Sequence, residues 1–422
     1  MTAQTASLNK TGVHVSNTRR IVMGIIFLAL AAVIWFYFGQ GMDPETVTTF
    51  GLNSGSTSAQ LPDWVFNTLN TLNILAGISA ALGAFQLARG FGQRTNLVLG
   101  LVVAFFLFGF LAWAAAGASL NLSGLLRTTL QRAVPITLGA LSGILCERAG
   151  VVNIAIEGMM LAGAMMGALV GSLVNNWAGL VAGMLTGALL ALIHAVLSIK
   201  YKTDQIVSGT VINIFSTGMT SFISAKFLQK YQNLNNPQIF APIEVPLLSK
   251  IPFIGPILFT HNMFMYLMFI LLFVLQFALF YTRWGLRMRS VGEHPKAADT
   301  LGINVIRTRY TSVLLGGLMA GFAGAYFTLG SVGRFDEVMT AGRGFIGLAA
   351  MIFGNWNPFG AFGAGLLFGF ADMLASRLAI LGVRIPSEVL LMAPYVATMI
   401  VLAGVVGRSQ APAADGKPYD KE

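Results

Sequence analysis

The sequence predicts an all-α polytopic membrane protein with about 10–12 transmembrane helices. Of its 422 residues, 55% are hydrophobic and only 10% are charged, whereas soluble globular domains carry roughly 25% charged residues. The mean hydropathy is +0.74, and the apolar residues gather in runs near the length of about 20 residues that crosses a membrane. The 48 glycines suit close helix packing in lipid. These observations exclude a soluble fold.

Polar stretches separate the apolar segments that form the expected helices. The segment 341–354 is short for a complete span, so we expect a re-entrant or broken helix there. Two long connections, 40–66 and 228–261, interrupt the series, and the second, rich in proline, is either an ordered cap or a solvated connector. The apolar segments lie at 21–39, 67–88, 96–117, 126–146, 155–174, 177–199, 203–227, 262–282, 310–330, 341–354, 359–376 and 386–406.

Composition also divides the chain along its length. Residues 1–20 are a polar N-terminus, 21–120 hold additional N-terminal membrane helices, and 121–408 form the core with one substantial loop at 283–309. Residues 409–422 are polar and contain proline, and we expect them to be a disordered tail.

Basic residues in the short connections predict the orientation. Most of them fall on one side if every segment crosses the membrane, and the positive-inside rule makes that side cytoplasmic. Both termini are then cytoplasmic, and the net charge of +10 is loop charge that gives no indication of nucleic acid. Four arginines fall on the opposite side and count against the scheme: Arg127, Arg132, Arg377 and Arg384.

The two halves of the core look alike. In the first half, "ERAGVVNIAIEGMMLAGA" (147–164) places polar residues in a glycine-punctuated break that leads into a glycine-rich helix. In the second half, "GRGFIGLAAMIFGNWNPFGAFGAGLLFGF" repeats the pattern, with Arg343 and residues 355–358 at its break. Paired breaks of this kind indicate the internal structural repeat that transporters use, with the solute path at the repeat interface.

The polar residues of the breaks have two interpretations. A charge in hydrocarbon costs several kcal/mol, so these groups either line a translocation path beside water or hold the breaks together by hydrogen bonds. The candidate path residues are Asn153, Glu157, Arg343, Asn355 and Asn357. Glu147 and Arg148 are expected to form an ion pair at the end of the fourth helix, and Asp372 is either a buried contact or a pore residue.

Glycines four residues apart recur on single helix faces. They allow helices to cross closely, and general membrane packing is the simplest interpretation of any one set. The sets are Gly163, Gly167 and Gly171; Gly179, Gly183 and Gly187; Gly317 and Gly321; and Gly365 and Gly369.

The loop 283–309 predicts a short surface helix. Pro295 suits a first helical turn, Ala297, Ala298 and Leu301 would share one face, and Gly302 suits the C-terminal stop. This helix is either a docking element for a soluble partner or an incidental surface turn.

No energy-converting or catalytic motif is recognisable in the chain. There is no phosphate-binding G-x-x-x-x-G-K-[ST] loop, no H-E-x-x-H zinc motif and no hydrolase triad context. The single cysteine, Cys146, excludes an intramolecular disulfide framework. We therefore expect a chain that is not an enzyme and binds no metal.

Three stretches together carry a family resemblance: 147–164, "GEHPKAADTLGINV" (292–305) and "GRGFIGLAAMIFGNWNPFGA" (342–361). They resemble the permease subunits of bacterial ABC importers for nucleosides and simple sugars, the group that contains ribose and branched-chain amino acid permeases. The resemblance covers about 120–410 and implies a multi-pass protein of the bacterial cytoplasmic membrane, in contact with lipid, with nucleosides as the small-molecule solute. The first and third stretches are similar to one of two non-identical permeases, which implies a heterodimer.

The resemblance also assigns partners and the docking role. It implies an ABC ATPase subunit that holds ATP and Mg, with no cofactor in this chain, and an extracellular substrate-binding lipoprotein. The coupling helix that docks on the ATPase would comprise Gly292, Glu293, His294, Pro295, Lys296, Ala297, Ala298, Leu301 and Gly302. His294 replaces the asparagine expected before the proline.

Two other kinds of function stay open. A sugar or branched-chain amino acid permease would share the fold, and an ion-driven secondary transporter would need no docking helix. An intramembrane enzyme would need a catalytic cluster at membrane depth, and the sequence offers none.

Overall fold

The computed structural model describes residues 17–53, 61–380, 392 and 410–421. Ten helices in these ranges are long and apolar enough to cross a membrane, which confirms the polytopic all-α fold. The expected segment 386–406 lies outside the described residues except for Met392. The ten spans are Asn17–Phe38, Thr68–Ala88, Gly92–Ala114, Leu122–Glu147, Ile156–Leu173, Asn176–Lys200, Gln205–Leu228, Met263–Tyr281, Val305–Val332 and Pro358–Arg377.

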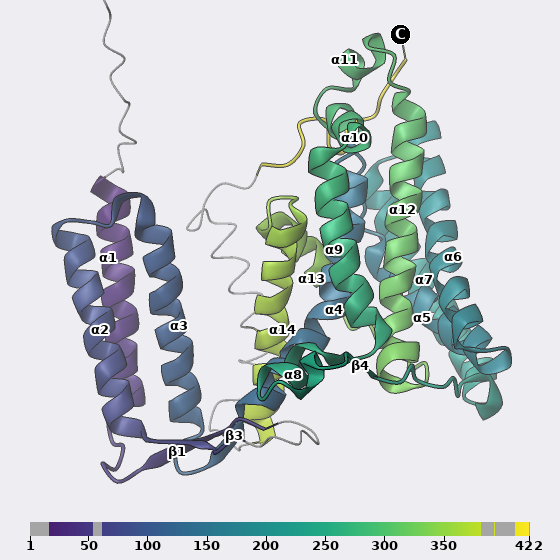
Figure 1. Cartoon of the computed structure of the whole chain (residues 1–422). Coiled ribbons are helices and arrows are strands. Elements are labelled where there is room, and N and C mark those ends of the chain that lie inside the picture. Colours follow the sequence, from purple (N-terminus) through teal and green to yellow (C-terminus); the bar gives the residue numbers. More distant parts are fainter. Residues whose placement is uncertain (1–16, 54–60, 381–391, 393–409, 422) are drawn as a thin grey trace, which may run out of the picture. The chain divides into compact units, whose positions relative to one another are not determined.

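The chain forms two compact units, divided near residue 122 (Figure 1). The first unit contains three helices and a small three-stranded sheet, in which β1 pairs antiparallel with β2 and parallel with β3. Its elements are α1 (Asn17–Ala32), β1 (Val47–Gly51), β2 (Trp64–Asn67), α2 (Thr68–Ala88), α3 (Thr95–Ala114) and β3 (Ser119–Asn121).

Aromatic side chains form much of the first unit's core. The Phe38 ring stacks on Trp113, and Phe50 meets Phe66 edge to face. The buried hydroxyls of Thr48 and Thr68 lie 2.8 Å apart, so the polar groups where the sheet meets α2 are partnered. The unit therefore has a core of its own.

The second unit holds the remaining helices. Figure 1 shows α10 and α11 at one end of its bundle and α8 and β4 at the other. Its elements are α4 (Leu122–Glu147), α5 (Ile156–Leu173), α6 (Asn176–Ala195), α7 (Gln205–Ile223), β4 (Ile243–Glu244), α8 (Ile254–Leu258), β5 (Thr260–His261), α9 (Met263–Tyr281), α10 (Arg283–Glu293), α11 (Pro295–Thr300), α12 (Val305–Ala325), α13 (Arg343–Phe353) and α14 (Pro358–Ile380).

The glycine sets of α5, α6 and α12 meet one another, and we call this contact the glycine seam. A Cβ added to Gly163 would lie 2.9 Å from the Cα of Gly321, and one added to Gly187 would lie 2.3 Å from the carbonyl oxygen of Gly317. Backbones in direct contact leave no room for a side chain, so these glycines serve specific helix crossings.

The connection 228–261 is ordered. β4 and β5 pair antiparallel across it, and the Tyr266 hydroxyl donates to the Ile243 carbonyl at 2.9 Å. Of the two interpretations of this connection, the ordered cap is the one that the structure supports.

The segment 341–354 forms one arm of a helical hairpin. α13 has 11 residues, or about 16 Å of helix, which is too short to cross a hydrocarbon core of about 30 Å. Asn355 and Trp356, both in the left-handed backbone region, reverse the chain into α14. Gly354 lets the arms approach closely, since its added Cβ would lie 2.1 Å from the Ala361 nitrogen.

Candidate functional site

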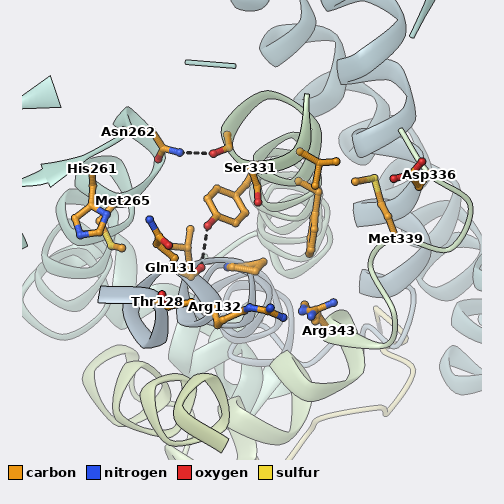
Figure 2. Close-up of a pocket in the computed structure, with 16 residues that line it drawn as sticks. Thr128, Gln131, Arg132, His261, Asn262, Met265, Ser331, Asp336, Met339 and Arg343 are labelled. Carbon is orange, nitrogen blue, oxygen red and sulfur yellow. Dashed lines mark hydrogen bonds between the residues drawn. The ribbon is translucent and has the colours of Figure 1, made fainter. Parts of the chain in front are cut away.

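A polar cavity of about 480 Å³ opens in the second unit (Figure 2). Small-molecule sites commonly occupy roughly 300–1,000 Å³. Its lining comes from α4, the start of α9, the helical continuation after α12 and the connection that leads into α13. The residues are Thr128, Gln131, Arg132, Val134, Pro135, His261, Asn262, Met265, Tyr326, Phe327, Gly330, Ser331, Val332, Asp336, Met339 and Arg343.

Two arginines on the cavity wall share one carboxylate. Arg132 Nη1 lies 2.9 Å and Arg343 Nη2 lies 3.1 Å from the same oxygen of Asp372. Two guanidinium groups against one carboxylate leave one net positive charge. Each guanidinium also carries N–H donors beyond the one that binds Asp372. This part of the wall therefore offers hydrogen-bond donors to solutes rich in acceptors.

Aromatic rings and amides complete the wall. The Tyr326 hydroxyl donates to the Gln131 carbonyl at 2.9 Å, and the Asn262 amide donates to the Gly330 carbonyl at 2.6 Å. Burial lowers the pKa of His261, which keeps its imidazole neutral at pH 7. A planar ring with polar edges finds both stacking surfaces and hydrogen-bond partners here.

Glu157 fastens the start of α13 to α5. Its carboxylate accepts hydrogen bonds from the Thr340 hydroxyl (2.6 Å), the Gly342 N–H (2.9 Å) and the Gly344 N–H (2.6 Å). A carboxylate at a helix N-terminus satisfies orphan N–H groups and complements the helix dipole. Glu157 therefore fixes the helix whose first residue, Arg343, lines the cavity.

The two breaks also contact each other at their other ends. The Trp356 indole N–H donates to Glu147 at 2.6 Å, and Arg148 Nε donates to the Trp356 carbonyl at 3.0 Å. The expected Glu147–Arg148 ion pair is thus wrong for the described residues, because each side chain turns to the second break instead. Hydrogen bonds across the two halves replace a contact within one.

The candidate path residues separate in the structure. Arg343 lines the cavity, whereas the other four do not. Asn153 is fully buried and accepts from the Ala155 N–H. Asn355 accepts from the Gln410 N–H, and Asn357 accepts from the Phe359 N–H at the start of α14. These contacts hold the breaks, as the structural interpretation expects.

The structure gives partners to Asp372 and to two of the four arginines that count against the orientation scheme. Arg132 opposes Asp372, and Arg127 donates to the Thr260 carbonyl at 3.1 Å. Arg377 lies in the last turn of α14, and Arg384 lies outside the described residues. Arg127 and Arg132 thus have bonding roles within the bundle.

The expected short helix is α11. It begins at Pro295, His294 caps it by accepting from the Ala297 N–H at 3.3 Å, and Gly302 follows it with φ +79°. His294 therefore takes over the capping role of an asparagine. Gly292 lies within α10, where an added Cβ would meet the Arg148 carbonyl at 2.3 Å, and Glu293 ends that helix.

The exposed face of α11 differs from the expected one. Ala298 is only 2% exposed because it packs against Val291 and Val305 of the same chain. Leu301 is 81% exposed, and Lys296 and Ala297 are also exposed. Ala298 and Leu301 therefore do not share one exposed face, because Ala298 is packed inside and Leu301 is exposed.

The C-terminal segment 410–421 is ordered against the bundle, so the expectation of a disordered tail is wrong for these residues. The Ala414 N–H donates to the Gly292 carbonyl at 2.8 Å, and Arg309 Nη1 donates to the Lys417 carbonyl at 2.9 Å. Polar composition alone predicted disorder, but the segment's backbone groups have partners at the loop end of the bundle.

Sequence reasoning missed most of the cavity wall. Gln131, Tyr326 and Asp336 stand in segments interpreted only as helices or connections. Arg132 did carry a signal, because a basic residue on the wrong side of a membrane scheme needs a local partner. Among the described residues, no group of three or more metal-binding side chains occurs.

This chain is similar in sequence to permease components of transport systems. Residues 125–406 match the family described as branched-chain amino acid transport system / permease component. The chain is 43% identical over 310 residues to the guanosine ABC transporter permease protein NupQ of Bacillus subtilis (strain 168), covering 71% of this chain and 97% of the relative.

Two further relatives extend the comparison. The nucleoside ABC transporter permease protein NupC of Lactococcus lactis subsp. cremoris (strain MG1363) is 43% identical over 68% of this chain and 93% of the relative. The putative glucose ABC transporter permease protein TsgC13 of Haloferax volcanii (strain ATCC 29605) is 34% identical over 60% of this chain and 78% of the relative. No solved structure matches the chain.

Proposed function

This chain belongs to the branched-chain amino acid transport system / permease component family, and from that premise we propose that it forms the pore through which an ABC importer takes up nucleosides. The observation that carries the cargo is the 43% identity to permeases named for guanosine and for nucleosides, over nearly their full lengths. The chain is a multi-pass membrane protein of a transport family rather than an enzyme.

The cavity supports this cargo on chemical grounds. A nucleoside is uncharged, has a planar base with acceptor-rich edges and carries a hydroxylated ribose. Arg132 and Arg343 supply donors, Tyr326 and Phe327 supply ring surfaces, and Asp336 and Ser331 supply acceptors for hydroxyl groups.

The remaining components of the proposal concern partners and orientation. A separate ATPase subunit holds ATP and Mg and acts on residues 292–302, which serve as the coupling helix. A second, related permease completes a heterodimer, and an extracellular lipoprotein delivers the solute. α10 and α11 carry three arginines and one lysine in 283–300, which supports a cytoplasmic location for that end of the bundle in a bacterial cytoplasmic membrane, with both termini on the same side.

Uptake of a labelled nucleoside by cells that express the complete transporter tests the proposal. We expect unlabelled nucleosides to compete and ribose and leucine not to compete. We also expect uptake to require a catalytically competent ATPase subunit. Absence of competition by any nucleoside would overturn the cargo, and uptake that survives loss of the ATPase but collapses with an ionophore would identify a secondary transporter.

Replacing Arg132 with glutamine should weaken nucleoside uptake through the cavity. The variant loses one cavity guanidinium while the Arg343–Asp372 pair remains charge-balanced. A charged hydrogen bond is worth about 1.5–3 kcal/mol, so the KM for nucleoside should rise at least about tenfold. The matched control is Arg127→Gln on the same helix, whose side chain does not line the cavity. Equal KM values in the two variants would contradict a solute-binding role.

A further inference from the structure

We propose that residues 410–421 are a positioning element that fastens the coupling helix α11 to the two polar breaks of the bundle, so that displacement of α11 reaches the solute pathway through this segment. The proposal rests on the coupling role proposed above for α11. The segment lies outside the residues 125–406 that match the family.

One set of contacts joins the segment to the coupling loop. The Ala414 N–H donates to the Gly292 carbonyl at 2.8 Å, and the Ala413 N–H donates to the Glu293 carboxylate at 3.2 Å. Tyr419 packs on the apolar cluster that contains Ala298. The segment therefore touches the end of α10 and the buried side of α11.

A second set joins the same segment to the breaks. The Gln410 N–H donates to Asn355 Oδ1 at 2.9 Å, at the reversal between α13 and α14. The Ala414 carbonyl lies against Gly150 of the first break, where an added Cβ would approach it to 3.1 Å. Gly150 has φ +82°, so both its backbone conformation and this close approach require glycine.

α11 buries little of its own surface. It contains six residues, far fewer than the roughly 12–15 that an isolated helix needs to be even marginally stable. Within α11 only Ala298 is buried. Its buried contact is the small cluster around Ala298, to which Tyr419 contributes an aromatic ring.

A pair of carboxyl groups connects the segment to α4. Asp415 and Glu147 lie close enough to interact electrostatically, and two buried carboxyl groups this close favour a state in which one of them carries a proton. Arg309 of α12 and Cys146 of α4 also interact electrostatically with Asp415, and Tyr419 interacts in the same way with Arg309. The contact thus depends on protonation as well as on geometry.

Thiol labelling in membranes tests the attachment. A cysteine at the Ala298 position should react slowly with a maleimide in the parent protein, and the native Cys146 gives little background because it is fully buried. Deletion of 410–422, or Tyr419→Ala alone, should raise the labelling rate at least tenfold. The control Ala411→Ser changes an exposed residue of the same segment and should leave the rate unchanged. Equal rates in all four proteins would overturn the attachment.

The coupling ratio tests the positioning role itself. In the assembled transporter, Tyr419→Ala should raise the ATP hydrolysed per nucleoside transported at least threefold while leaving the KM for nucleoside unchanged. A loss of folded protein alone would lower both activities together and leave the ratio constant. An unchanged ratio beside faster labelling would overturn the role. Labelling needs no cargo, so a wrong cargo would abolish the transport readout only.

The attachment should also weaken as pH rises. Burial raises the pKa of Asp415 to about 7, whereas a free aspartate titrates at about 3.9. The attached state of the segment therefore binds a proton that the detached state releases. The attachment is strongest below the pKa of a free aspartate and weakens progressively as pH rises through about 7. We expect the labelling rate at 298, divided by that of a cysteine at the exposed 297 position, to increase from pH 6 to pH 8. Asp415→Asn should make this ratio independent of pH, and a slope retained in that variant would contradict the assignment.

Discussion

Replacing Glu157 with alanine should lower the thermal unfolding temperature of the purified protein by about 5–10 °C. The substitution leaves the Thr340 hydroxyl and the Gly342 and Gly344 N–H groups without their acceptor. Each buried donor left unsatisfied costs about 1–3 kcal/mol, and the loss falls on the helix that presents Arg343 to the cavity. Thermal unfolding in detergent, followed by size-exclusion chromatography, measures the effect.

The matched control for this prediction is Glu157→Gln. Glutamine keeps one carbonyl oxygen, which can still accept from Thr340 and Gly342, but turns an amide N–H₂ toward the Gly344 N–H. We expect a loss of stability between those of the parent and the alanine variant. An alanine variant as stable as the parent would show that water replaces the carboxylate without cost and would remove Glu157 as the anchor of α13.

Leu301→Asp should abolish transport without unfolding the chain. Leu301 is 81% exposed next to α11, so the substitution removes no internal contact. If α11 docks on the ATPase, a carboxylate buried there without a partner costs about 2–5 kcal/mol of binding. We expect at least tenfold less uptake and loss of ATPase copurification from detergent-solubilised membranes.

Leu247→Asp is the matched control for the docking prediction. Leu247 is 80% exposed but lies in the cap at the opposite end of the second unit from α11, between β4 and α8. This variant should keep the ATPase in the purified complex. Retention of the ATPase by Leu301→Asp as well would refute the docking face, whereas Ala298→Asp would not be decisive because Ala298 is part of the chain's own packing.

The sequence predicted those elements whose ends and lengths are determined by residues close together in the chain. Pro295 begins α11 because proline lacks an N–H, which the first helical turn does not need. Gly302 follows the end of α11 because glycine readily adopts the left-handed conformation that ends a helix. The shortness of 341–354 predicted the hairpin arm for the same kind of reason. The membrane spans follow from apolar length alone.

Contacts between distant residues escaped prediction. Arg132 and Asp372 are 240 positions apart, and no periodicity links them. The Glu147 carboxylate turned to Trp356 rather than to adjacent Arg148 because the folded hairpin brings an indole N–H to it. The tail was predicted to be disordered because its composition is polar, but its partners are backbone groups and carboxylates far back in the chain.

The glycine seam also determines which parts of the bundle are able to move. Where backbones touch without side chains between them, no rotamer change can absorb a sliding motion, and displacement of one helix drives the other two. We therefore expect α5, α6 and α12 to move together as one rigid body. The α13–α14 hairpin is held to α5 by hydrogen bonds at Glu157, which can break and re-form. We therefore expect this hairpin to be able to move relative to the rigid body formed by α5, α6 and α12.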